Sequence, residues 1–189
     1  LRDLKSIVRR AFFLFVSGAS IIAVSIILLF TTKLFIFDKL NFYGGIMMIF
    51  GLVLLAKTFP DEQFVENKFW LWFLPLLGIS IAAPFNVFIK GLQILPNGSV
   101  APINGPGIIF FVITVVGYLI FSFWLFFKKY LRLSGKARLQ AQYFFLGVLI
   151  FITAIVTFNV ILPALGISQF NIIGAMSSVI FIGFTAYAL

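Results

Sequence analysis

Residues 107–127 read GIIFFVITVVGYLIFSFWLFF and contain no charged residue. A helix needs about 20 predominantly apolar residues to cross the roughly 30 Å hydrocarbon core of a bilayer. The run is continuous and does not alternate between polar and apolar residues, so it does not fit a strand of a transmembrane barrel. This stretch therefore predicts a membrane-spanning helix.

Five other apolar runs accompany this one, and together they determine the fold that we expect. The chain has 189 residues, of which 62% are hydrophobic and 10% charged, and its mean hydropathy is +1.18. A soluble domain is about half apolar and a quarter charged. We therefore predict an all-α integral membrane protein, a polytopic bundle of six transmembrane helices that forms a single domain over residues 1–189. The predicted spans are 11–31, 42–59, 69–89, 107–127, 142–162 and 170–189.

The basic residues determine the expected orientation. The net charge is +9, and Lys and Arg lie between the apolar runs rather than along a stripe, so we expect no nucleic acid partner. The connections on one side hold Arg2, Lys5, Arg9, Arg10, Lys57, Lys68, Lys128, Lys129, Arg132, Lys136 and Arg138, and those on the other hold Lys33, Lys39 and Lys90. Because cytoplasmic loops carry the excess of Lys and Arg, we expect both ends of the chain to face the cytoplasm. The cytoplasmic interface would then hold all three tryptophans, Trp70, Trp72 and Trp124.

Several residue types that common chemistry needs are absent. The chain has no cysteine and no histidine, which excludes disulfides, thiol chemistry, the usual general base and the commonest transition-metal ligand. No Asp, Glu, Lys or Arg falls deep within a predicted span, and proton relays, pumps and voltage sensors depend on such residues. We therefore expect no catalytic residue, no metal and no cofactor.

The connection 90–106 is the largest on the outer side. It contains ILPNGSVAPI, residues 94–103, in which apolar arms flank a Pro-Asn-Gly-Ser turn. This pattern is typical of a short hairpin. The hairpin could be a lid over a ligand site or an ordered linker, and we favour the linker.

Few polar side chains remain within the predicted spans, and three are candidate contacts between helices or with a ligand: Asn86, Asn159 and Tyr118. Asn86 and Asn159 each lie roughly 6 Å inside the outer end of an outward-running span, at 1.5 Å per residue. Each has a helix-breaking proline nearby, Pro84 or Pro163, which leaves backbone carbonyls free to accept hydrogen bonds. The asparagines would line an outward-facing ligand pocket or form hydrogen bonds between helices, and we favour the hydrogen bonds.

Three segments toward the C-terminus share a known pattern: RLQAQYFFLG (138–147), NVILPALG (159–166) and FIGFTAYAL (181–189). They resemble the closing helices of the seven-helix membrane sensor region at the N-terminus of many bacterial histidine kinases. In that family, a basic, Gln-containing connection enters the penultimate helix, an Asn-x-Leu-Leu-Pro-x-x-Gly-like motif ends it, and a last helix ends in Ala-Tyr-Ala. Gln142 departs from the family, which often has a basic residue there, and the family's first helix is missing. The matching residues are Arg138, Gln140, Tyr143, Gly147, Asn159, Leu162, Pro163, Gly166, Ala186, Tyr187 and Ala188.

The resemblance implies a transmembrane sensor domain, formed by the second to seventh helices of a seven-helix region in a bacterial inner membrane. Such a domain would act as a homodimer among membrane lipids. It would pass an unidentified signal through its last helix to a cytoplasmic effector, a histidine kinase of a two-component system, C-terminal to Leu189. The chain starts without methionine and stops within an apolar run, so we expect a fragment. The alternatives are a small-molecule transporter, which would need inverted repeats and helices broken near the midplane, and an intramembrane enzyme.

Overall fold

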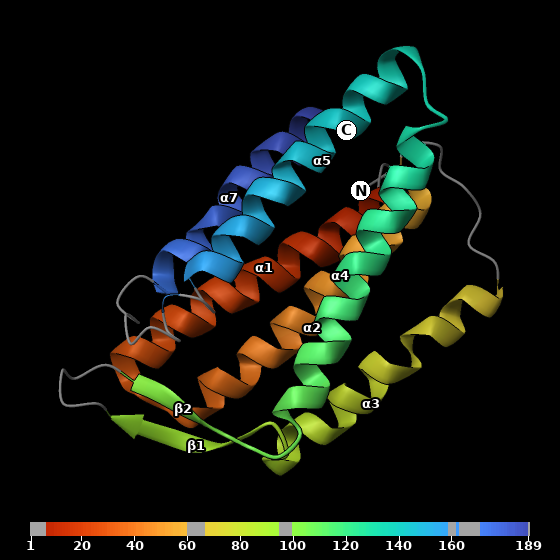
Figure 1. Cartoon of the computed structure of the whole chain (residues 1–189). Coiled ribbons are helices and arrows are strands. Elements are labelled where there is room, and N and C mark those ends of the chain that lie inside the picture. The colour runs from red at the N-terminus through yellow and green to blue at the C-terminus, as the bar shows by residue number, and fades with distance from the viewer. Residues whose placement is uncertain (1–6, 60–66, 95–99, 159–161, 163–170, 189) are drawn as a thin grey trace. The chain divides into compact units, whose positions relative to one another are not determined.

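A computed structural model gives the architecture of the chain and describes residues 7–59, 67–94, 100–158, 162 and 171–188 (Figure 1). Most of these residues are helical, and the strands among them form one two-stranded sheet. Contacts between residues divide the chain into two compact units, Leu1–Phe123 and Trp124–Leu189. The single domain expected over residues 1–189 stays a prediction.

The first unit begins with two long helices, α1 (Ile7–Thr32) and α2 (Phe35–Thr58). Near the end of α1, the hydroxyl of Thr32 donates to the carbonyl of Leu28 at 2.6 Å. Lys33 then adopts a left-handed conformation with φ of 57°, which is a common way for a helix to end. The short connection makes α2 run back along α1.

Glycines let α1 and α2 pack with their backbones close together. A methyl group at Gly18 would lie 2.6 Å from the carbonyl oxygen of Gly44, and one at Gly51 would lie 2.5 Å from the backbone nitrogen of Phe15. Small residues join helices in this way in lipid, where packing rather than the hydrophobic effect drives association. The side chains of Phe15 and Leu55 are fully buried in this unit.

The third apolar run, predicted as one span over 69–89, is a broken helix. Pro75 and Pro84 each lack the backbone N–H that the preceding turn of a helix would use, and both lie where the helix type changes. The run consists of the 3-10 helix η2 (Asn67–Phe73), the α-helix α3 (Leu74–Ala82) and the 3-10 turn η3 (Ala83–Phe85).

The connection after η3 forms the hairpin that its sequence indicates. Strands β1 (Ile89–Ile94) and β2 (Val100–Asn104) pair antiparallel, so the hairpin prediction is confirmed. After β2, the N–H of Gly105 donates to the carbonyl of Phe88 at 2.7 Å. This bond brings the start of the next helix back to the residues that follow η3.

Helix α4 (Ile108–Tyr130) begins in the first unit and ends in the second. The second unit continues with α5 (Gly135–Val156) and α7 (Asn171–Ala188), which pack against each other. The core between α5 and α7 is aromatic. Phe144 and Phe181 are fully buried, and their ring centroids lie 5.5 Å apart.

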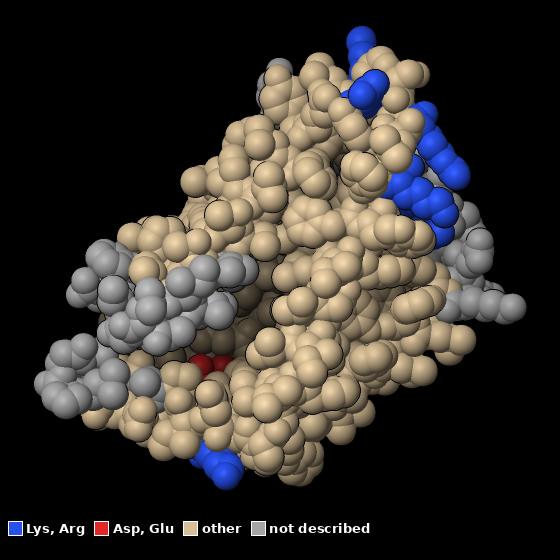
Figure 2. Space-filling model, viewed as in Figure 1, with Lys and Arg blue, Asp and Glu red and all other residues tan. Residues whose placement is uncertain are grey.

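Basic side chains gather around the connection between α4 and α5 on the face that Figure 2 shows. The Lys128 ammonium lies 5.1 Å from the ring centroid of Trp124, and the Arg138 guanidinium lies 5.0 Å from that of Tyr130. Aromatic and basic residues together are typical of helix ends at a membrane surface. The basic residues of this connection are Lys128, Lys129, Arg132, Lys136 and Arg138.

The helices are long and apolar enough to cross a bilayer, which agrees with the prediction of an all-α membrane protein. The last predicted span is the helix α7, and the apolar stretch Phe69–Phe85 is shorter than a span. The total of six spans stays a prediction. Among the described residues, four helical stretches are long and apolar enough to cross a membrane: Ile7–Thr32, Phe35–Thr58, Ile108–Tyr130 and Gly135–Ala154.

Candidate functional site

Prolines in the third apolar run leave two backbone carbonyls without their usual partners. In a 3-10 helix a carbonyl accepts from the N–H three residues on, so the Trp72 carbonyl would need the N–H that Pro75 lacks. In an α-helix the interval is four residues, so the Ser80 carbonyl would need the N–H that Pro84 lacks. Within hydrocarbon, such groups must be satisfied by other parts of the protein.

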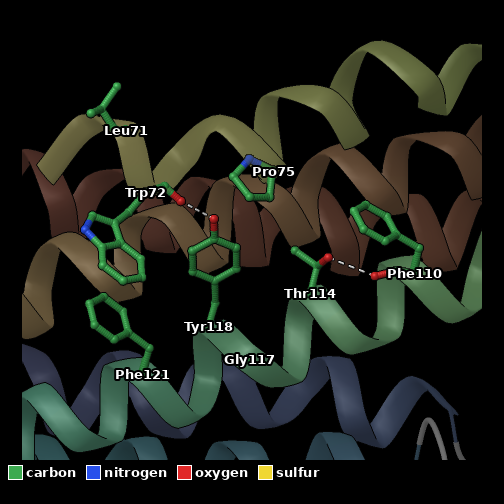
Figure 3. Close-up of a pocket in the computed structure, with 8 residues that line it drawn as sticks. All are labelled: Leu71, Trp72, Pro75, Phe110, Thr114, Gly117, Tyr118 and Phe121. Atoms are coloured by element: carbon green, nitrogen blue, oxygen red, sulfur yellow. Dashed lines mark hydrogen bonds between the residues drawn. The ribbon is translucent and has the colours of Figure 1, made fainter. Parts of the chain in front are cut away.

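Tyrosines from the two neighbouring helices supply these partners. The Tyr118 hydroxyl of α4 donates to the Trp72 carbonyl, as Figure 3 shows. The Tyr43 hydroxyl of α2 donates to the Ser80 carbonyl at 3.2 Å. The η2–α3 segment is therefore joined to α4 through the Trp72 carbonyl and to α2 through the Ser80 carbonyl.

The start of α2 makes a second set of contacts near the hairpin. The Lys39 ammonium donates to the carbonyl of Pro84 at 3.0 Å. The ring centroid of Phe42 lies 5.7 Å from that of Phe88 and 4.6 Å from that of Phe111. The start of α2, the start of the hairpin and the start of α4 thus meet in one aromatic cluster.

A groove lies between the η2–α3 segment and α4, and its lining is mostly apolar (Figure 3). Its volume of about 690 Å³ is within the range of roughly 300–1,000 Å³ that small-molecule sites have. Both hydroxyls on its wall are engaged, because Tyr118 bonds to Trp72 and Thr114 donates to the Phe110 carbonyl at 2.8 Å. The groove therefore suits an apolar molecule. The lining residues are Leu71, Trp72, Pro75, Phe110, Thr114, Gly117, Tyr118 and Phe121.

Of the predicted contact residues, the structure describes Tyr118 and Asn86, and the two lie in different surroundings. Tyr118 makes a hydrogen bond between helices. Asn86 lies beyond the end of the helix instead of within a span; it is exposed, and its left-handed φ of 58° turns the chain toward β1. The helix ends before Asn86 because Pro84 interrupts its hydrogen bonds. Asn159 and Pro163 lie outside the described residues, so a contact between the two asparagines stays a prediction.

Asp38 is a buried acidic residue that the sequence placed in a connection between spans. It belongs to the first turn of α2, and only 7% of its surface is exposed. The predicted span began at residue 42 because Asp38 and Lys39 interrupt the apolar run, whereas α2 begins at Phe35. The helix dipole favours an acidic residue in the first turn, and this pattern was the signal of an earlier start.

In the second unit, Gly147 of α5 packs closely against α7. A methyl group there would lie 2.7 Å from the Cβ of Phe184. The ring of Phe144, one turn earlier, packs at 76° against the ring of Phe181. The α5 segment of the pattern therefore lies directly against the last helix.

Gln142, the residue that departs from the family pattern, makes a contact with α4 instead. Its amide donates to the Tyr130 hydroxyl at 2.8 Å.

The chain matches no protein-family model, no curated protein and no solved structure. The likeness to the sensor region of histidine kinases accordingly rests on the motif residues themselves. Four of these residues lie in α5: Arg138, Gln140, Tyr143 and Gly147.

Proposed function

We propose that the chain is the membrane-embedded sensory input module of a bacterial signal-transduction receptor, most simply a histidine kinase of a two-component system. An extracellular or membrane signal acts on the first unit, and α7 passes the change to a cytoplasmic effector C-terminal to Leu189. The receptor is a homodimer in the bacterial inner membrane, with both ends of this chain in the cytoplasm. The basic residues around the α4–α5 connection support this orientation, because such residues favour the cytoplasmic side.

The contact between Gly147 and Phe184 carries the proposal. Gly147 belongs to the pattern shared with the sensor region, and it is where α5 approaches α7 most closely among the glycine contacts of the second unit. Packed helices shift between discrete arrangements rather than deform continuously. A change in the position of α5 would therefore be transmitted to the last helix, from which an effector would receive it.

The first unit offers a place where a signal could act. Hydrogen bonds between helices contribute on average about 0.6 kcal/mol, and at most about 1.7 kcal/mol, within membranes. The bonds that Tyr118 and Tyr43 make to the η2–α3 segment are therefore weak enough to be exchanged. An apolar molecule in the groove beside Tyr118 would shift the position of α3 if it binds two arrangements with different affinity. Helix α4 lines this groove and continues into the second unit.

A small-molecule transporter is the second candidate, and the broken third run is the observation that favours it. Transporters build their substrate sites from interrupted helices near the membrane midplane. Here the interruptions lie at the two ends of α3, at Pro75 and Pro84. Uptake of a small molecule by the purified protein in sealed vesicles would distinguish this candidate from the sensor.

The test of the sensor uses the full-length protein in membranes and two matched glycine variants. Gly147→Ala places a methyl group against Phe184, whereas the same change at Gly183, on α7, meets no atom within 4 Å. We expect Gly147→Ala to change the phosphorylation output of the receptor and Gly183→Ala to leave it unchanged. Membrane insertion of both variants is checked in parallel, so that loss of protein is not mistaken for loss of signalling.

Two results would contradict the sensor. One is unchanged output from Gly147→Ala in protein whose α5–α7 packing has measurably shifted. The other is a gene that continues beyond Leu189 into further membrane spans instead of an effector domain.

A further inference from the structure

Asp38 is the only acidic residue among those that the structure describes, and it is buried without a charged partner. It lies in the first turn of α2 with 7% of its surface exposed. It forms no ion pair within the described part of the chain. An ionised carboxylate is very unfavourable in an apolar environment unless it is paired, so this side chain requires an explanation.

Asn41 lies three residues further along, on the same face of α2. Its side chain lies within hydrogen-bonding reach of the Asp38 carboxyl group. One oxygen of each side chain, Oδ2 of Asp38 and Oδ1 of Asn41, is buried and has no hydrogen-bond partner. An amide oxygen and a carboxylate oxygen can only accept. The pair therefore lacks one donor, and a single proton would supply it.

Neighbouring cations do not fill this position. The Lys39 ammonium donates to the Pro84 carbonyl and lies 4.9 Å from the ring centroid of Phe35. The helix α3 and the turn η3, which also pack on α2, carry no charged residue. The other charged residues on the neighbouring elements lie elsewhere. Lys33 precedes α2, Lys57 lies at the far end of α2, Arg9 and Arg10 lie on α1, and Lys90 lies on β1.

We propose that Asp38 and Asn41 form a proton-binding site at the start of α2. The proton is held on Oδ2 of Asp38 and donated to Oδ1 of Asn41, while the Asn41 amide donates to the carboxyl group in return. This ring of two hydrogen bonds leaves no charge in the site and no unpaired oxygen. A metal cation would need several further oxygen ligands, which these two side chains do not provide.

Release of the proton would place an unpaired negative charge beside contacts that hold the first unit together. Lys39, the next residue, is bonded to η3. Phe42, one turn later, packs on Phe88 and Phe111. A rise in pH on this side of the membrane therefore loosens the junction between α2, the hairpin and α4.

Infrared difference spectroscopy of the purified chain in lipid nanodiscs detects this proton directly. We expect the carbonyl band of a protonated acid to persist in the wild type at pH values where exposed carboxyl groups are ionised. Asp38→Asn should lack the band. Glu62→Gln, which removes a carboxyl group elsewhere in the chain, is the matched control and should keep it. Absence of the persistent band from the wild type would overturn the proposal.

The pH dependence of stability gives a second readout. An amide at position 38 can form the same two hydrogen bonds, so Asp38→Asn is expected to fold. Stability of the wild type should fall as the pH rises above about 4, where aspartate in an unfolded chain ionises. The folding constant should decrease by up to tenfold per pH unit. Asp38→Asn should lose this part of the pH dependence, and Glu62→Gln should retain it.

Identical pH profiles for the wild type and Asp38→Asn would also overturn the proposal. So would a profile that follows sodium concentration at constant pH, because a metal ion would then occupy the place of the proton. Neither measurement uses signalling output. A result that overturns the proposed sensory function therefore does not overturn the proton site, and a result that overturns the proton site does not overturn the sensory function.

Discussion

One added methyl group at Gly51 tests how closely α1 and α2 approach each other. In Gly51→Ala the new carbon would lie 2.5 Å from the backbone nitrogen of Phe15 and 2.8 Å from the carbonyl oxygen of Ala11. Both neighbours are backbone atoms, so no side-chain rotation relieves the overlap. The helices must separate locally by about 0.9 Å to reach the 3.4 Å at which ordinary contact begins.

Two opposing effects determine the size of the change. Overpacking of a well-packed interior costs about 1–3 kcal/mol. Alanine, in return, favours the helical state over glycine by up to about 1 kcal/mol. Gly51→Ala should therefore lower the free energy of unfolding by about 1–2 kcal/mol, on the order of a tenfold change in the equilibrium constant. Gly45→Ala lies on the same helix but meets no atom within 4 Å, so only the helix preference should act and stability should stay level or rise.

The assay is reversible unfolding of the purified chain in mixed detergent micelles, followed by circular dichroism. Gly51→Ala should be less stable than the wild type, whereas Gly45→Ala should be as stable or more stable. Because both variants are measured in the same micelles, any influence of the detergent on stability cancels in the comparison. Equal stability of Gly51→Ala and Gly45→Ala would refute the close approach of α1 and α2.

Two further predictions concern the tyrosine bonds and the orientation. Tyr118→Phe removes the donor to the Trp72 carbonyl and should lower the free energy of unfolding by about 0.6–1.7 kcal/mol in the same assay; an unchanged value would mean that the bond contributes nothing. Because the chain has no cysteine, single cysteines report on topology: a membrane-impermeant maleimide should label Ser99→Cys in intact cells and Ser134→Cys only after permeabilisation. The reverse labelling pattern would contradict the proposed orientation.

Features that depend on neighbouring residues along the chain were predictable. The run at 107–127 became α4 (Ile108–Tyr130), because an uninterrupted apolar stretch of that length satisfies its backbone in lipid only as a helix. The segments on either side of the Pro-Asn-Gly-Ser sequence became β1 and β2, which pair antiparallel as the local pattern indicates.

The prediction was weaker where polar residues interrupt an apolar run. Asp38 and Lys39 suggested a connection, yet both lie within α2. The end of the third run at η3 was also missed, although Pro84 had been recognised as helix-breaking. A proline shows that a bond is lost, but the sequence does not show whether the helix bends, tightens or ends there.

The sequence by itself determined the membrane class, the helix-forming runs, the hairpin and the helix-breaking character of Pro84. Only the tertiary structure decided that Tyr118 bonds to the Trp72 carbonyl, that Tyr43 bonds to the Ser80 carbonyl, and that Asp38 is buried beside Asn41. The physical reason is the range of the interactions. Helices and turns arise from bonds between residues a few positions apart, whereas the partner of a side chain and the water around it depend on which helix packs against which face.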